Sequence, residues 1–337
     1  MEVVSYVDLK PFQTFKVDVQ ARYFFEFSSL NGLIEGLNFQ KKQKIPYLIL
    51  GGGSNILFTQ NFEGIVLKNY LKGKEIIQEN AENIWIKVQS GENWHEFVSY
   101  CVENQWNGIE NLALIPGTVG AAPIQNIGAY GKELKDVLES LEAFHIPSQE
   151  VHTFYLSDCE LGYRDSVFKR KYKNQYVILS VTLKLNKKPV LNFSYSDVQK
   201  YLETHQLTPS IKNIYDAVVS IRKEKLPDPA IVGNAGSFFK NPYVTTEKYH
   251  SLKKDYFHLP SFFIDEKTVK IPAAWLIEQC GWKGFREKDL GVHPKQPLVL
   301  VNYGNAKGKE IYELAQKIMQ SVKQKFDIDL EPEVNIL

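Results

Sequence analysis

The chain has 337 residues, of which 44% are hydrophobic and 23% are charged, and its formal net charge at pH 7 is +1. This length is enough for two or three domains, and the composition is that of an ordinary soluble globular protein. A net charge this close to zero argues against nucleic acid or an anionic membrane as a partner.

The three cysteines, Cys101, Cys159 and Cys280, are widely separated and show no Cys-X-X-Cys spacing. They predict a reducing compartment, and the seven histidines are not spaced as metal ligands, so we expect no metal site. Met1 is followed directly by Glu2, without the basic and apolar segments of a secretory signal. We therefore expect a cytoplasmic protein without a membrane segment.

The first predicted elements are short strands that end in turns. Tyr47–Leu50 is an apolar run that ends at three consecutive glycines, and Gly64–Leu67 and Asn83–Val88 are also predicted to be strands. A helix is predicted to begin at Asn93, with Glu96 as the capping partner three residues on. Its expected buried side chains follow at helical spacing: Trp94, Phe97, Val98, Cys101 and Val102.

The second half adds one long strand and three helices. Tyr176–Leu185 alternates apolar and polar residues and predicts a half-buried strand. Thr208-Pro209 predicts the start of a helix with proline at its first position, and Leu226–Pro229 predicts the linker after it. Two further helices are expected at Pro272–Gly281 and Gly308–Phe326. The mixture predicts an α+β protein with a boundary near residue 227.

The most unusual segment runs from Ile115 to Gly131, I-P-G-T-V-G-A-A-P-I-Q-N-I-G-A-Y-G, with four glycines, two prolines, three alanines and no charge. Such a run cannot continue as a helix or a central strand, and a surface loop ordinarily carries charge. Small uncharged residues let the backbone approach a large group that is not protein, and Gln125 and Asn126 add two amides. The alternative is a tight turn packed between sheets.

A second glycine cluster, Gly51–Asn55, follows the apolar strand at Tyr47–Leu50. Main-chain amides in such a turn form a concavity suited to phosphate. Ile56 stands where the Rossmann dinucleotide fingerprint needs its third glycine, and no Gly-Lys-Ser/Thr follows as in a P-loop. Any dinucleotide here must be bound without the Rossmann turn.

Three polar residues from distant parts of the chain are unremarkable when taken singly. Arg164 would be a surface arginine, Ser237 a turn hydroxyl and Glu333 a solvated carboxylate near the end of the chain. Phe239 replaces the glycine that a nucleophile elbow needs two places after Ser237. Their occurrence together with the two glycine segments is what gives them significance.

Five segments, in this order, resemble the UDP-N-acetylenolpyruvoylglucosamine reductases (UDP-N-acetylmuramate dehydrogenases), flavoenzymes of bacterial peptidoglycan synthesis: Gly51–Asn55, Ile115–Gly131, Gly162–Ser166, Gly233–Pro242 and Glu331–Val334. The resemblance implies an α+β fold, with a two-subdomain FAD-binding module of the vanillyl-alcohol-oxidase (PCMH) type and a C-terminal α+β substrate-binding domain. It implies boundaries of 1–72 for the first subdomain, with or without the tail 334–337, 73–226 for the second subdomain and 227–333 for the substrate domain. Tyr195 indicates the subtype with a tyrosine-bearing substrate loop.

The resemblance also implies non-covalent FAD, with NADPH as co-substrate and the pyrophosphate held by main-chain amides. The expected cofactor-binding residues are Gly51, Gly52, Gly53, Ser54, Asn55, Ile115, Pro116, Gly117, Gly120, Ala121, Gln125, Asn126, Gly128, Ala129 and Tyr130. The expected substrate-binding residues are Tyr195, Lys225, Asn241 and Gln296.

The implied reaction reduces the enolpyruvyl ether of UDP-N-acetylglucosamine, with hydride passing from NADPH to FAD and then to the methylene carbon. In this reaction Arg164 stabilises the developing negative charge, since its guanidinium stays protonated, and Glu333 is a second polarising group that is protonated or held by a cation. Ser237 donates the proton to the intermediate carbon.

Two alternatives remain open from the sequence. Another FAD oxidoreductase of the same fold, acting on a different sugar or alcohol, would leave the joint presence of Arg164, Ser237 and Glu333 unexplained. A catalytically silent nucleotide-binding protein would need none of the three. We can locate no apolar interface stripe, so we expect a monomer whose partners are small molecules. The chain stops four residues after Glu333, which raises the question of how that end is anchored.

Overall fold

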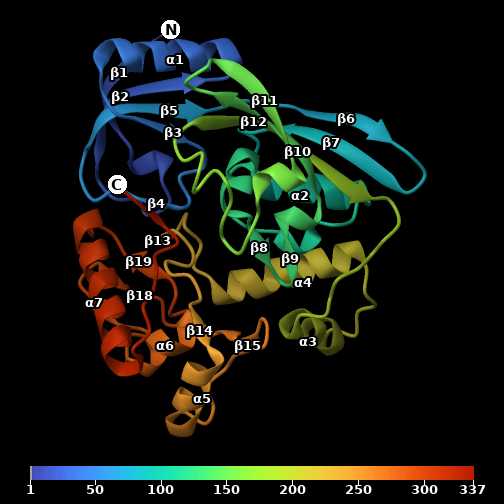
Figure 1. Ribbon diagram of the computed structural model, residues 1–337, viewed down its shortest axis with the longest axis vertical. Helices are drawn as coiled ribbons and strands as arrows, with labels where there is room; N and C mark the ends of the chain where they lie inside the picture. The colour runs from blue at the N-terminus through green and yellow to red at the C-terminus, as the bar shows by residue number, and fades with distance from the viewer. Residues whose placement is uncertain (1) are drawn as a thin grey trace. The chain divides into compact units, whose positions relative to one another are not determined.

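The computed structural model describes residues 2–337 (Figure 1). Its contacts divide the chain into two compact units. The first unit contains Met1–Val7, Ala21–Gly52 and Glu63–Glu224, and the second contains Asp8–Gln20, Gly53–Phe62 and Lys225–Leu337. Each unit therefore assembles from segments that lie far apart in the sequence.

A four-stranded sheet has the strand order β1-β2-β5-β3. These strands are β1 (Val4–Asp8), β2 (Gln20–Phe27), β5 (Phe62–Asn69) and β3 (Tyr47–Leu50), which confirms the two strands expected here. β3 pairs with β5 in parallel. Helix α1 (Leu30–Gln43) begins after Ser29, whose hydroxyl accepts a hydrogen bond from Gly32 N, and its Leu33 joins the core of this sheet.

A five-stranded antiparallel sheet in the first unit has the order β11-β10-β12-β7-β6. Its strands are β6 (Lys74–Glu79), β7 (Asn83–Gln89), β10 (Leu138–His145), β11 (Glu150–Tyr155) and β12 (Tyr176–Asn186). The prediction that β12 is half-buried was wrong, because Ser180 and Thr182 are only 1% and 6% exposed. β12 is the central strand, and it contributes Leu179 to the core beneath α1 and Leu183 to a second core, so both faces are packed.

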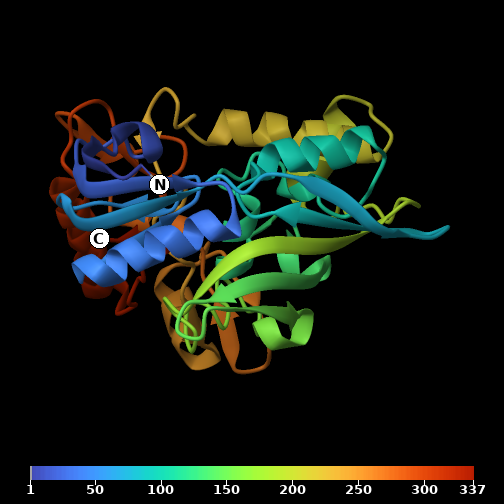
Figure 2. The same cartoon turned by 90° about the horizontal axis from the view of Figure 1, so that it is seen from above.

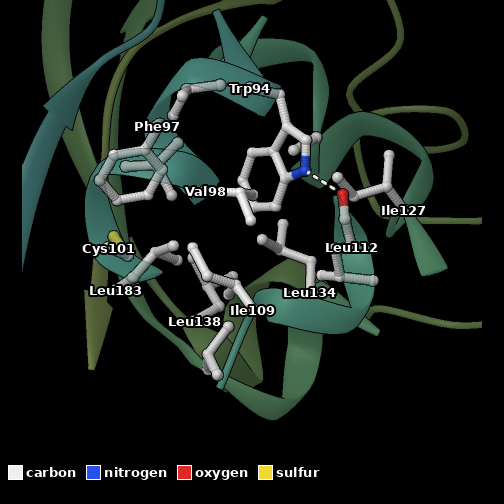
Figure 3. Close-up of a cluster of buried hydrophobic side chains, with 14 of the residues drawn as sticks. Trp94, Phe97, Val98, Cys101, Ile109, Leu112, Ile127, Leu134, Leu138 and Leu183 are labelled. Carbon is white, nitrogen blue, oxygen red and sulfur yellow. Dashed lines mark hydrogen bonds between the residues drawn. The ribbon is translucent and has the colours of Figure 1, made fainter. Parts of the chain in front are cut away.

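Helix α2 (Trp94–Glu103) lies in the second core and confirms its predicted cap and buried stripe. Asn93 Oδ1 accepts a hydrogen bond from Glu96 N at 3.1 Å, and all five predicted stripe residues are buried. The Trp94 indole N–H donates to Leu112 O at 2.9 Å, among the side chains of Ile109, Leu134 and Leu138 (Figure 3).

Two further helices of this part of the chain are α3 (Ser196–Thr204) and α4 (Ile211–Lys225). The start predicted for α4 was wrong by two residues, because Ser210 Oγ accepts a hydrogen bond from Asn213 N and caps the helix after Pro209. α4 lies beside α2 (Figure 2), and the hydroxyls of Ser99 and Tyr215 are 2.8 Å apart. Short 3-10 turns are Lys10–Phe12 (η1), Glu110–Leu112 (η2), Val119–Ala121 (η3), Pro123–Gln125 (η4), Leu134–Asp136 (η5) and Leu156–Cys159 (η6). A small hairpin joins β8 (Gly128–Ala129) to β9 (Lys132–Glu133).

The second unit contains two small antiparallel sheets, in the orders β13-β19-β18-β17 and β14-β16-β15. Their strands are β13 (Gly233–Asn234), β14 (Tyr243–Thr245), β15 (Phe262–Phe263), β16 (Thr268–Lys270), β17 (Arg286–Glu287), β18 (Leu290–Val292) and β19 (Leu300–Asn302). The helices are α5 (Thr246–Asp255), α6 (Ala273–Gln279) and α7 (Gly308–Phe326), of which the last two confirm the predicted helices.

The C-terminus is anchored in the second unit by strand pairing. β20 (Asn335–Ile336) pairs in parallel with β4 (Ile56–Leu57). Leu337 N donates to Leu57 O at 2.9 Å, and Thr59 N donates to Leu337 O at 2.6 Å. The short end after Glu333 is thus fixed by the segment that follows the first glycine cluster.

Among residues 2–337, no helix is both long enough and apolar enough to cross a membrane. All three cysteines are free, and Cys101 and Cys159 are buried.

Candidate active site

The two glycine segments expected to bind the cofactor cross each other in the first unit. A Cβ at Gly52 would lie 2.8 Å from Gly117 Cα, and a Cβ at Gly51 would lie 2.6 Å from Thr118 Oγ1. Two backbones approach this closely only where a side chain is absent. The crossing therefore brings together the end of β3 and the 115–131 run, the two segments that the family resemblance assigns to one cofactor.

The 115–131 run is irregular, as predicted, and it is tied to the loop between β7 and α2. It forms the turns η3 and η4 before it enters β8. Val119 N donates to Glu92 O and Gly120 N to Ser90 O, both at 2.9 Å, and a Cβ at Gly120 would lie 2.4 Å from Ser90 Cβ. One side of the run is therefore a tightly packed turn, which was the alternative interpretation of its composition. Gly117, Thr118 and Gly128 keep part of their surface exposed.

Asn126 uses its side chain within the protein. It is fully buried, and its Nδ2 donates to Glu133 Oε2 at 3.0 Å and to Gly162 O at 2.9 Å. Its Oδ1 accepts a hydrogen bond from Lys135 N at 3.0 Å. The amide thus holds the Gly162 turn, which carries Arg164, against the 115–131 run.

Arg164 lies directly against this run. Its Nη2 donates to Gly128 O at 2.7 Å, and its guanidinium carbon is 5.6 Å from the centre of the Tyr163 ring. Arg164 has a φ of +53°, in the left-handed region, where a side chain costs about 1–3 kcal/mol.

A second arginine, Arg222 on α4, lies near Arg164. Its side chain hydrogen-bonds Tyr130, and its Nε is enclosed and has no hydrogen-bond partner among residues 2–337. Burial lowers the pKa of Arg222, the interaction with Tyr130 opposes this change, and the charge of Arg164 adds to it. Two neighbouring guanidinium groups attract an anion.

Tyr195 lies at the start of α3 and contacts the same part of the run. The rings of Tyr130 and Tyr195 meet edge to face, with their centres 5.2 Å apart. The pKa of Tyr130 is raised, because burial outweighs the opposing effect of the Arg222 charge. Tyr195 remains 42% exposed, so much of its surface is open to a ligand.

Residues Gly53–Asn55 lie in the second unit. Gly53 has a φ of +62°, and a Cβ there would lie 2.0 Å from Phe12 O, so only glycine fits this position. Ser54 follows in the same turn, and Asn55 Nδ2 donates to Glu333 O at 3.3 Å.

Ser237 and Glu333 lie on adjacent extended segments of the second unit. Glu333 N donates to Phe238 O at 2.7 Å, and Phe239 pairs with Pro332. On the other side Phe238 N donates to Leu298 O at 2.7 Å. The structure thus brings two predicted catalytic residues close together although 96 positions separate them in the sequence (333 − 237 = 96).

The predicted substrate-binding residues of the second unit have defined places. Asn241 Oδ1 accepts a hydrogen bond from Ala273 N at 2.9 Å, at the start of α6. Gln296 lies in a turn where its N–H donates to His293 Nδ1 at 3.2 Å. Lys225 is the last residue of α4.

Comparison with known proteins decides which family this fold and site belong to. Residues 21–154 match the model of an FAD binding domain, and residues 228–337 match the model of the UDP-N-acetylenolpyruvoylglucosamine reductase C-terminal domain. The UDP-N-acetylenolpyruvoylglucosamine reductase of Amoebophilus asiaticus is 48% identical over 338 residues, which cover 100% of both chains. This chain belongs to the UDP-N-acetylenolpyruvoylglucosamine reductase family.

Solved structures show the same fold. The crystal structure of UDP-N-acetylenolpyruvylglucosamine reductase from Thermus caldophilus aligns with a TM-score of 0.68 at 22% identity, covering 99% of this chain and 98% of that one. p-Cresol methylhydroxylase aligns with a TM-score of 0.51 at 10% identity, covering 96% and 83%. The predicted fold is confirmed: a PCMH-type FAD-binding module with a C-terminal α+β domain. The protein is an FAD-dependent oxidoreductase of peptidoglycan precursor synthesis.

The residues of this reductase fit FAD on structural grounds. The missing side chains at Gly52 and Gly117 make room for the backbone of the other segment. Gly117, Thr118 and Gly128 keep part of their surface exposed, so main-chain amides beside the crossing can approach a pyrophosphate. The run itself has no acidic residue to repel it. The enclosed Nε of Arg222 is an unused donor in the same unit, of the kind that a polar ligand satisfies.

Sequence reasoning missed three residues that contact Tyr130 and Gly131 at the end of the 115–131 run. Asn111 Nδ2 donates to Tyr130 O, Asn192 Nδ2 donates to Gly131 O, and the Arg222 side chain hydrogen-bonds Tyr130. A signal existed for Arg222, because it follows Ile211, Ile214 and Val218 at helical spacing and so lies on the apolar face of α4. Asn111 and Asn192 gave no such signal, since their contacts join segments 81 residues apart.

Proposed function

We propose that this protein reduces UDP-N-acetylglucosamine enolpyruvate to UDP-N-acetylmuramate, using NADPH and FAD, as a cytoplasmic monomer. Two observations carry the proposal: Arg164 is held against the 115–131 run, and Ser237 lies on a segment adjacent to Glu333. Neither pairing is needed for a protein that only binds a nucleotide. The full-length identity to a relative named for this reaction supports it.

We assign the cofactor to the glycine crossing. Main-chain N–H groups of Gly51–Asn55 and of the 115–131 run hold the pyrophosphate. Tyr130 lies near the end of that run. FAD bound there would supply the hydride-transfer chemistry between NADPH and the methylene carbon of the enolpyruvyl group. For the domain boundaries we propose those that the resemblance implies: FAD-binding subdomains at 1–72, with or without the tail 334–337, and at 73–226, and a substrate domain at 227–333.

The protein must stabilise the negative charge that hydride addition places on the adjacent carbon and its carboxylate. Arg164 provides a permanent cation, already oriented by its bond to Gly128 O, so little reorganisation is needed during the reaction. Glu333 polarises the same group when it is protonated or held by a cation, since a free carboxylate would repel the developing charge.

Ser237 donates the proton to the carbon. Serine is a weak acid, but a carbanion-like centre is a strong base, so geometry decides the rate. Hydrogen bonds of the backbone on both sides of Ser237 support this role. Gly236 N donates to Asn234 Oδ1 at 2.9 Å, and Phe238 N donates to Leu298 O at 2.7 Å.

We assign the UDP-sugar to four residues. Tyr195 contacts the nucleotide from the loop before α3, and Lys225 provides a counter-charge for the diphosphate. Asn241 and Gln296 are the other two residues that we assign to the UDP-sugar.

Flavin absorption tests the proposal directly. The purified protein is expected to be yellow, to bleach under NADPH without oxygen, and to regain its colour only when UDP-N-acetylglucosamine enolpyruvate is added. Reoxidation by oxygen alone at a comparable rate would indicate an oxidase of the same fold. A colourless protein that FAD does not reconstitute would indicate a silent nucleotide-binding protein.

A further inference from the structure

The hairpin at the end of the 115–131 run has an unusual turn. Gly128 pairs with Glu133 and Ala129 with Lys132, so Tyr130 and Gly131 alone form the connection. Both have positive φ, +48° and +80°, as in a type I′ turn. Asn, Asp or Gly is preferred at the first of these positions, so a tyrosine there is retained against the local conformational preference.

Two asparagine amides hold the carbonyl groups of this turn. Asn111 Nδ2 donates to Tyr130 O at 3.0 Å, and Asn192 Nδ2 donates to Gly131 O at 3.0 Å. Asn111 Nδ2 also donates to Asn192 O at 2.9 Å, which joins the two asparagines. The amide of Asn192 lies so near that a Cβ at Gly131 would be 3.3 Å from its Nδ2.

These bonds attach the segment before α3 to the turn. Asn192 Oδ1 accepts a hydrogen bond from Ser194 Oγ at 3.0 Å, and Asn107 Oδ1 accepts one from Val190 N at 2.9 Å. Three residues after Asn192, the ring of Tyr195 meets the ring of Tyr130. The Tyr130 side chain is held in turn by Arg222.

We propose that Asn111 and Asn192 are positioning residues, which hold segment 190–195 on the Tyr130–Gly131 turn and so set Tyr195 in place before the UDP-sugar binds. The proposal rests on the function proposed above, in which Tyr195 contacts the nucleotide. A segment already ordered loses less conformational entropy on binding, so the attachment increases substrate affinity. The tyrosine in a left-handed position is explained, because its ring forms the contact surface for Tyr195.

Substitution of Asn192 tests this directly, because the side chain is half-buried and outside the hydrophobic core. Asn192→Ala removes the bond to Gly131 O, and we expect KM for the UDP-sugar to rise about tenfold while kcat changes less than twofold. The rate of flavin bleaching by NADPH should be unchanged. Ser194→Ala is the matched control: it removes a bond within the segment, leaves the bonds to Tyr130 and Gly131, and should keep the wild-type KM.

Hydrogen exchange gives a readout that does not depend on turnover. In the FAD-loaded protein without substrate, amides of residues 190–196 should exchange faster in Asn192→Ala than in the wild type or in Ser194→Ala. Added UDP-sugar should restore their protection.

The proposal would be overturned if Asn192→Ala changed neither the amide exchange of residues 190–196 nor KM for the UDP-sugar. A tenfold fall in kcat with no change in KM would also overturn it. Failure of the proposed function is recognised separately, because the wild-type flavin would then not be reoxidised by the UDP-sugar. Asn111→Ala removes a fully buried amide, so its loss of folding would be uninformative by itself, and Asn192→Ala decides the question.

Discussion

The crossing of Gly52 and Gly117 makes a quantitative prediction for Gly52→Ala. The added Cβ would lie 2.8 Å from Gly117 Cα and 3.3 Å from Gly117 C, both backbone atoms that no side-chain rotation can move. Overpacking of this kind costs about 1–3 kcal/mol. If the two segments must keep this crossing to bind FAD, the cost appears in the binding free energy, and the Kd for FAD rises by about 5–150-fold.

The assay is fluorescence titration of the apoprotein with FAD, combined with thermal unfolding with and without FAD. Gly32→Ala is the matched control, also a glycine-to-alanine change but in helix α1, where the nearest atom to the new Cβ is Phe27 Cβ at 3.4 Å. Because alanine restricts the unfolded chain, Gly32→Ala should raise stability by about 0.4–1 kcal/mol and leave the Kd for FAD unchanged.

The reasoning would be refuted if Gly52→Ala kept the wild-type Kd for FAD. In that case the close crossing would serve chain packing only. Equal loss of stability with and without FAD would lead to the same conclusion, since a ligand-linked effect must make the two differ.

Three other predictions concern catalysis, the core and pH. Ser237→Ala should keep the wild-type rate of flavin reduction by NADPH and slow flavin reoxidation by the UDP-sugar about 10²–10³-fold in stopped-flow. Wild-type rates in both half-reactions would contradict the role of Ser237. Trp94→Phe leaves the buried Leu112 carbonyl without its indole donor and should lower the free energy of unfolding in urea by about 1–3 kcal/mol. A loss below about 0.5 kcal/mol, the size of a surface substitution, would show that the hydrogen bond contributes little. Burial raises the pKa of Glu110, with the Gly108 N–H opposing, so the native state binds this proton more tightly than the unfolded chain. The stability of the wild type relative to Glu110→Gln should therefore be greatest below about pH 4.3 and fall as pH rises through the raised pKa, and a difference independent of pH would contradict the shift.

Elements defined by local signals were predicted well from the sequence. α7 has its predicted bounds, Gly308–Phe326, because its apolar stripe is regular. α2 begins where Asn93 and Glu96 form the expected cap. The start of α4 was misplaced, because Pro209 is a helix-start signal but the serine after it provides the actual cap.

Features set by tertiary packing were not predictable. The alternation in β12 indicates one polar face, but small hydroxyl residues such as Ser180 are buried when the strand is central, and Ser180 Oγ donates to Glu142 Oε2 at 2.9 Å. The anchoring of Glu333 likewise depends on Asn55 and Phe238, which are distant in the sequence. Composition indicated that the 115–131 run approaches a large group that is not protein, with a tightly packed turn as the alternative, and only the structure shows that Gly52 lies against the run within the first unit.

The same limit applies to the asparagines that hold the Tyr130–Gly131 turn. No periodicity or motif marks Asn111 and Asn192, because each acts through a carbonyl group of a distant segment. Arg222 was recognisable in principle as a charged residue on an apolar helix face.

A single turnover without oxygen tests the central claim most directly. Enzyme reduced with one equivalent of NADPH is mixed with UDP-N-acetylglucosamine enolpyruvate, and the product is measured by mass spectrometry as the flavin absorbance returns. We predict one UDP-N-acetylmuramate for each flavin reoxidised. A flavin that stays reduced, with the enolpyruvyl sugar recovered unchanged, would contradict the account.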